Sequence, residues 1–128
     1  PWQYILDVLS GYLKLAEVTY ANKNKDLINS YNFGPDISEN INVETLVKSV
    51  LKEWSIEKKI IIKKSAFDEF QYLVLSNENA INHLGWRPIF DFNKSIEQTV
   101  QWYKSTADSK NYLRATQEAI EHFVQYSK

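Results

Sequence analysis

Apolar residues recur every three or four positions over the first twenty residues of the chain, which is the spacing of one face of an α-helix. The sequence therefore predicts a helix that runs to about Tyr20 and is buried along this apolar stripe. Pro1 suits the start of a helix, where its missing N–H costs little. The stripe consists of Trp2, Ile5, Leu6, Leu9, Tyr12, Leu13 and Ala16.

Trp2 and Gln3 lie at the start of this predicted helix. Backbone N–H groups there have no intrahelical partner, and the helix dipole is positive at this end. An anion such as a diphosphate could be held at such a place. The pattern alone favours the plainer interpretation, a buried helix that begins with a tryptophan.

Four further helices are predicted along the rest of the chain. Asn42 and Asp91 are good N-caps, and they precede stretches of helical periodicity that predict helices over 43–54 and 92–103. A terminal amphipathic helix is expected at about 109–127. Ser76 is expected to begin a short helix that ends at Gly85, where a left-handed C-cap belongs.

Three short segments favour strands. Residues 30–33 lie before the turn signal Gly34-Pro35-Asp36, and residues 60–62 are three consecutive isoleucines between lysines. We interpret those lysines as protection of a sheet edge rather than as a nucleic-acid patch, because no aromatic residues alternate with them. The third segment is 72–75. The predicted fold class is α+β, a single mostly helical domain over 1–128 with short strands.

Composition excludes several classes of function. The chain has 128 residues and a net charge of −1, so no overall field favours nucleic acid or an anionic membrane. Cysteine is absent, which fits a reducing compartment such as the cytoplasm, and no segment has the length and apolarity of a membrane span or signal peptide. Methionine is also absent, so the chain either lost its initiator or is a piece of a longer protein.

Motifs for a self-contained active site are missing. The three glycines do not form a dinucleotide fingerprint or a phosphate loop, and no tyrosine is followed four positions later by lysine. Glu118 and His122 share a helix face but make a poor metal site. Asp68-Glu69 are expected to be loop charges or acceptors for ligand hydroxyls rather than an acid–base pair. The sequence therefore predicts no catalytic, metal-binding or cofactor-binding residue in this chain.

A series of motifs runs in order along nearly the whole chain. The motifs are Pro1-Trp2-Gln3, Leu9-Ser10-Gly11-Tyr12-Leu13, Leu15-Ala16-Glu17, Asn32-Phe33-Gly34-Pro35-Asp36, Val43-Glu44, Leu46-Val47, Glu69, Tyr72-Leu73, Leu75, Leu84-Gly85-Trp86-Arg87-Pro88, Thr99-Val100, Trp102-Tyr103-Lys104, Thr116-Gln117 and Ile120. In this order they resemble CDP-glucose 4,6-dehydratases, members of the extended short-chain dehydrogenase/reductase family. The Leu-Gly-Trp-x-Pro element at 84–88 is shared widely among nucleotide-sugar dehydratases and epimerases, whereas the segment with Pro-Trp-Gln at 1–3 and Leu-Ser-Gly-Tyr-Leu at 9–13 is more specific for the CDP-glucose branch.

The resemblance implies that the chain is a C-terminal substrate-binding domain. In such enzymes an N-terminal Rossmann domain binds NAD and carries the Tyr-x-x-x-Lys pair. The parent enzyme would then be an NAD-dependent lyase of deoxysugar biosynthesis that converts CDP-glucose to CDP-4-keto-6-deoxyglucose. The chain alone would bind no NAD and would be inactive. Its expected partners are the nucleotide sugar, the Rossmann domain of the same polypeptide and, as a further candidate, a second copy.

The resemblance also implies which residues contact the nucleotide sugar. Trp2 and Gln3 match the family's substrate-facing segment, and Glu69 matches an acidic position in the loop beside the nucleotide. Tyr4, which stands where the family usually has histidine, is included with them. Asp68 replaces another usual histidine, and Ser76 replaces a usual aspartate. These departures put the nucleotide preference in doubt.

Two alternatives remain at this level. The chain could belong to another nucleotide-sugar dehydratase or epimerase with a different base or sugar. It could instead be a stand-alone interaction or dimerisation module, in which the helix from Asn111 to Tyr126 covers a partner helix. An isolated domain is expected to expose apolar surface and to self-associate.

Overall fold

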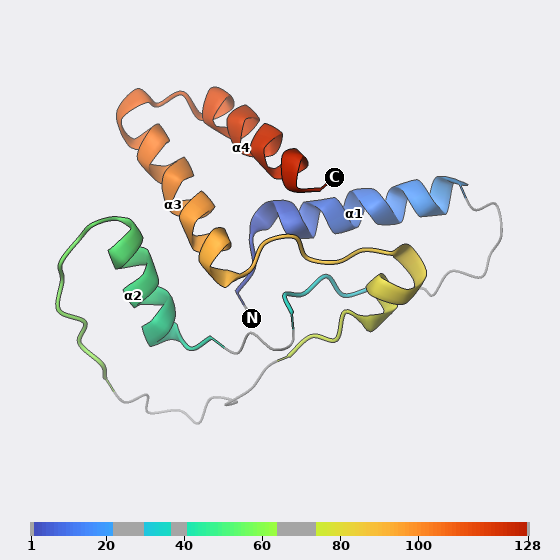
Figure 1. Cartoon of the computed structure of the whole chain (residues 1–128), viewed down its shortest axis with the longest axis horizontal. Coiled ribbons are helices and arrows are strands. Elements are labelled where there is room, and N and C mark those ends of the chain that lie inside the picture. The colour runs from blue at the N-terminus through green and yellow to red at the C-terminus, as the bar shows by residue number, and fades with distance from the viewer. Residues whose placement is uncertain (1, 22–29, 37–40, 64–73, 128) are drawn as a thin grey trace.

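The computed structural model describes residues 2–21, 30–36, 41–63 and 74–127. Figure 1 shows α3 and α4 as a helical hairpin whose free end, the C-terminal end of α4, meets the beginning of α1, while α2 lies beside α3. The π-helical turn η1 lies near the later part of α1. The elements are α1 (Ile5–Ala21), α2 (Val43–Glu53), η1 (Ala80–Leu84), α3 (Phe92–Ser109) and α4 (Tyr112–Tyr126).

Side-chain caps fix where the later helices begin. Asn42 Oδ1 accepts a hydrogen bond from Thr45 N at 2.8 Å, and Asp91 Oδ1 accepts one from Lys94 N at 2.8 Å. Both predicted N-caps are therefore confirmed. The left-handed C-cap is confirmed as well, because Gly85 has φ 66° and its N–H bonds back to the last turn of η1.

The predicted α+β class is wrong, because the part of the chain that the structure describes contains helices and no strand. Residues 60–62 form no strand, and Ile61 and Ile62 are 76% and 70% exposed. Residues 32–34 lie against 76–77 through the amides of Asn32 and Asn77, which donate to the backbone carbonyls of Ser76 and Gly34. Strand-favouring residues need a paired strand, and these segments have none among the described residues.

The predicted loop between the last two helices is also shorter than expected. Residues 105–109 continue α3, and the connection is only Lys110-Asn111. Lys110 has the left-handed φ of 52°, which ends α3, and Asn111 Oδ1 accepts from Arg114 N at 3.1 Å to begin α4. The terminal helix predicted at about 109–127 therefore begins three residues later, at Tyr112.

Two aromatic clusters hold α1 to the rest of the chain. Tyr4, Phe90 and Phe123 form the first cluster, with the Tyr4 and Phe90 rings 5.3 Å apart. The second contains Leu84 and Trp86 with Ala80, and Leu15, Val18, Tyr31 and Phe33 pack around it. α1 thus contacts the helical hairpin at its first turn and the η1 region at its later turns.

The apolar stripe of α1 that the sequence predicts to be buried is instead largely exposed. Ile5 is 62% exposed, Tyr12 59% and Leu13 72%. The opposite face is buried, because Asp7 is fully enclosed and Gly11 lies directly against the Phe33 ring. Packing within this chain therefore covers the face that carries an acid and a glycine.

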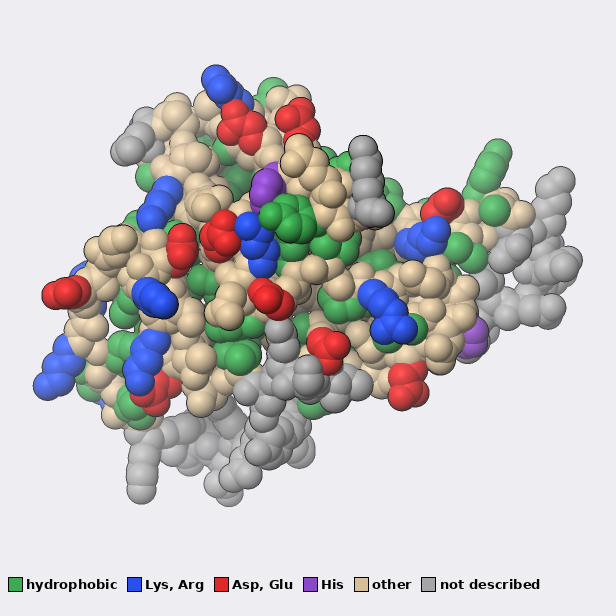
Figure 2. All heavy atoms as spheres, in the orientation of Figure 1, with side chains coloured by type: hydrophobic (Ala, Val, Ile, Leu, Met, Phe, Trp, Pro, Cys, Tyr) green, Lys and Arg blue, Asp and Glu red, His purple; other side chains and the backbone are tan. Residues whose placement is uncertain are grey.

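The outer surface mixes charges of both signs. Figure 2 shows basic and acidic side chains interspersed over this face of the molecule, with no patch of a single sign. Many of them form pairs along one helix, such as Lys14 with Glu17 and Arg114 with Glu118. Among the described residues, none of the helices combines the length and apolarity that crossing a membrane requires.

Candidate functional site

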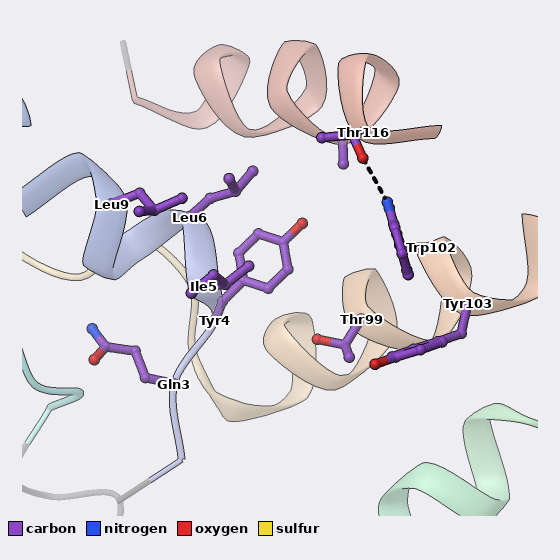
Figure 3. Close-up of a pocket in the computed structure, with 10 residues that line it drawn as sticks. Gln3, Tyr4, Ile5, Leu6, Leu9, Thr99, Trp102, Tyr103 and Thr116 are labelled. Atoms are coloured by element: carbon purple, nitrogen blue, oxygen red, sulfur yellow. Dashed lines mark hydrogen bonds between the residues drawn. The ribbon is translucent and has the colours of Figure 1, made fainter. Parts of the chain in front are cut away.

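An apolar pocket of 490 Å³ lies where the first turns of α1 meet the α3–α4 hairpin. Figure 3 shows the ring of Tyr4, which directly precedes α1, with Thr99 and Tyr103 from α3 and Thr116 from α4 around this space. The volume is within the range of small-molecule sites. The lining residues are Gln3, Tyr4, Ile5, Leu6, Leu9, Thr99, Trp102, Tyr103, Thr116 and Ala119.

Three of the hydrogen-bonding side chains of this pocket, Thr99, Trp102 and Thr116, already bond within the protein. Trp102 Nε1 donates to Thr116 Oγ1 at 3.1 Å, which ties α3 to α4 (Figure 3). Thr99 Oγ1 donates to the Ser95 carbonyl at 2.7 Å. No charged residue is among the described residues that line the pocket. The pocket therefore suits a flat or apolar group, such as a base, and offers no counter-charge to a diphosphate.

Of the three neighbouring residues predicted to contact the nucleotide sugar, Gln3 and Tyr4 line this pocket and Trp2 does not. The Trp2 ring is 41% exposed, and its Nε1 donates to the Ile41 carbonyl at 3.0 Å. Gln3 lines the pocket, and its Nε2 is shielded from solvent with no acceptor among the described residues. A buried amide donor of this kind favours a ligand acceptor.

Tyr4 has a mainly structural environment. It is 5% exposed and contacts Phe90 and Phe123, while one side of its ring also lines the pocket. Burial, followed by the negative charge of nearby Asp7, raises the pKa of the Tyr4 hydroxyl. Tyr4 is therefore a neutral hydrogen-bonding group at this end of the pocket.

Other residues considered from the sequence lie elsewhere. Glu69 and Asp68 lie outside the described residues. Glu118 pairs with Arg114 at 2.8 Å, and His122 lies against the rings of Phe90 and Tyr126. The part of the chain that the structure describes contains no group of three or more His, Cys, Asp or Glu side chains that could hold a metal ion.

Asp7 holds the start of α1 in place beside the pocket, and the sequence analysis did not predict this role. Its Oδ1 accepts from Ile89 N at 2.7 Å, and its Oδ2 accepts more weakly from Phe90 N at 3.4 Å. Burial raises the pKa of the Asp7 carboxyl, and these two backbone hydrogen bonds partly oppose the shift. Asp7 thus holds the extended link 86–90 against the first turn of α1.

The pocket residues of α3 and α4 were also missed. Thr99, Trp102 and Tyr103 recur at i, i+3 and i+4, so the spacing alone could have placed them on one helix face. Only the fold shows that this face of α3 meets α1 and lines the pocket between them.

The described residues do not fit a dinucleotide such as NAD. Gly11 lies within α1, Gly34 lies against the Leu75 backbone, and Gly85 ends η1. None of these glycines forms a turn between a strand and a helix that could bring backbone N–H groups to a pyrophosphate.

Comparison with known proteins gives one type of relative, a dehydratase. No family model matches the chain, and no solved structure matches it. The relative is the CDP-glucose 4,6-dehydratase of Salmonella typhimurium, which is 26% identical over 125 residues. The match includes 97% of this chain but only 34% of that protein. The chain therefore spans about a third of the length of this curated relative.

Proposed function

We propose that this chain is the nucleotide-sugar-binding part of an NAD-dependent CDP-glucose 4,6-dehydratase. The observation that carries the proposal is the similarity to the Salmonella enzyme over nearly the whole chain. The absence of dinucleotide motifs from this sequence agrees with a part that binds substrate only. The redox chemistry would belong to residues elsewhere in a longer protein, and no catalytic step is assigned to this chain.

The pocket between α1, α3 and α4 is the proposed place for the base of the nucleotide. Its aromatic and aliphatic walls offer stacking surface, and the unpaired Gln3 Nε2 supplies a donor for a base or sugar oxygen. The diphosphate would lie outside the pocket, because no charged side chain lines the described part of it. Trp2 does not line the pocket, but its ring is exposed and it precedes Gln3 in the chain, so it is the proposed second contact.

The natural gene product that contains this sequence provides the test. It is incubated with NAD and, separately, with CDP-, dTDP-, GDP- and UDP-glucose. We expect CDP-glucose alone to lose one water and yield a 4-keto sugar, which mass spectrometry detects. Turnover of a different nucleotide sugar would replace the CDP assignment with another dehydratase or epimerase. If all four sugars are returned unchanged, the proposal is wrong.

A matched pair of glutamine variants in the same gene product tests the pocket. Gln3→Ala removes the unpaired donor and is expected to raise the KM for CDP-glucose about tenfold, as the loss of one hydrogen bond would. Gln125→Ala changes an exposed glutamine of α4 that does not line the pocket, and it is expected to leave KM unchanged. Equal effects of the two variants would exclude the pocket as the nucleotide site.

A further inference from the structure

Trp102 is the largest side chain around the apolar pocket, and open space borders it in two places. It lines the apolar pocket, and it also lines a separate polar hollow of 250 Å³ on the α3–α4 hairpin, together with Gln98, Ser105 and His122. A side chain in a close-packed core is held in one rotamer by its neighbours. Trp102 lacks such an enclosure, so packing alone does not fix the orientation of its ring.

The two rings beside Trp102 do not confine it either. The Tyr103 ring meets it edge-on, with centroids 5.2 Å apart, and the Tyr112 ring lies at 6.1 Å with 35° between the planes. Both tyrosines are exposed, at 54% and 56%. Rings that are themselves largely in solvent can move aside, so these contacts leave Trp102 free to change rotamer.

The hydrogen bond to Thr116 supplies the missing restraint. The indole has a single donor, Nε1–H, which donates to Thr116 Oγ1 at 3.1 Å across the α3–α4 hairpin (Figure 3). A hydrogen bond restricts angle as well as distance, so it fixes the plane of the ring. Figure 3 shows the indole almost edge-on, with one face turned toward the Tyr4 side of the pocket. Thr116 is exposed, so its side chain serves no core.

We propose that Thr116 is a positioning residue of the pocket, which holds the Trp102 indole in the orientation on which a nucleotide base stacks. This inference rests on the proposed function, because it takes the pocket as the nucleotide site. Aromatic faces bind bases by stacking, and a wall that is already oriented loses less conformational freedom when the ligand arrives. Thr116 acts on binding through Trp102 and takes no part in the reaction, so it should influence KM and leave kcat unchanged.

The natural gene product that contains this sequence is assayed with NAD and with CDP-glucose, or with whichever of the four nucleotide sugars it turns over. Thr116→Val keeps the shape of threonine but removes the acceptor. It is expected to raise KM about fivefold, as the loss of one hydrogen bond would. Thr116→Ser retains the hydroxyl and should restore the KM of the wild type. The matched control is Thr45→Val, since Thr45 is exposed on α2 and does not line the pocket, and its KM should equal that of the wild type.

A second background separates positioning from direct contact with the ligand. Trp102→Phe keeps an aromatic ring at this place and removes the donor that Thr116 holds. In that background Thr116→Val should have no further effect on KM, because no hydrogen bond remains to be lost.

Four results would overturn the proposal. These are an unchanged KM in Thr116→Val, a loss of kcat in place of a rise in KM, no recovery with Thr116→Ser, and a further rise in KM from Thr116→Val in the Trp102→Phe background. The last result would place Thr116 in direct contact with the ligand. A wild type that leaves all four sugars unchanged contradicts the proposed function, and this inference with it. The four results require an active wild type, so the two failures are distinguishable.

Discussion

The two faces of α1 differ in how well apolar spacing predicts their burial. The predicted apolar stripe, which includes Ile5, Leu9 and Leu13, has the regular spacing of a buried helix, yet it is exposed. The inner face contains a carboxylate and a glycine, yet it is the face that this chain buries. Apolar spacing alone therefore does not identify the face that the same chain covers, whereas Asp7 and Gly11 make the specific contacts that do. The predictions that follow test this difference.

The largest expected effect is at Asp7. Asp7→Ala leaves the backbone N–H groups of Ile89 and Phe90 without their acceptor in a buried place. The free energy of unfolding should fall by about 3 kcal/mol. Urea denaturation followed by circular dichroism measures the change. On the outer face, Leu13→Gln should alter stability by less than about 0.5 kcal/mol. Equal losses for the two variants would remove the distinction between the faces.

A smaller effect is expected at Gly11, where an added Cβ would overlap the Phe33 ring. Gly11→Ala gains about 1 kcal/mol of helix propensity but should still lose about 1–2 kcal/mol net, because the packed ring has to move. Combination with Phe33→Ala supplies the control. In that background the overlap is gone, and Gly11→Ala should stabilise. A net loss in both backgrounds would show that the ring is not the cause.

Ser10 tests the polar link between α1 and the 86–90 segment. Trp86 Nε1 donates to Ser10 Oγ at 2.9 Å, and Trp86 is 5% exposed. Ser10→Ala leaves that indole N–H unsatisfied and should cost about 1 kcal/mol. Ser105 serves as the control, since its hydroxyl bonds only within exposed α3, and Ser105→Ala should cost less than about 0.5 kcal/mol.

The smallest effect is a dependence on pH. Burial raises the pKa of Asp7 in the folded state above its ordinary value near 3.9. Between these two values the folded chain binds more protons at this site than the unfolded chain does, so the contribution of Asp7 to stability falls as pH rises through the window and is constant above it. Asp7→Asn removes the dependence. Denaturation of both proteins from about pH 3.5 to 7 should show the stability of the wild type relative to Asp7→Asn falling as pH rises. A relative stability that rises with pH would contradict the assignment.

Local signals in the sequence predict local structure well here. The caps at Asn42 and Asp91 and the left-handed Gly85 follow from neighbouring residues, and the structure confirms them. The strands failed because residues 30–33 and 60–62 need partners that propensity does not supply. Within the pocket, the resemblance had already pointed to Gln3 and Tyr4. Thr116 and Trp102 could not be placed together, because their contact depends on the angle between α3 and α4.

The hydrogen bond from Ile89 to Asp7 joins residues 82 positions apart, which has a consequence for the order of folding. The α3–α4 hairpin is closed by a two-residue connection and can form by itself as a local unit. α1 is different, because it leaves the ribosome long before the segment that encloses Asp7 has been made. During that interval both of its apolar faces are bare, so we expect nascent chains to be most prone to aggregation, and most dependent on chaperones, until residue 90 has emerged.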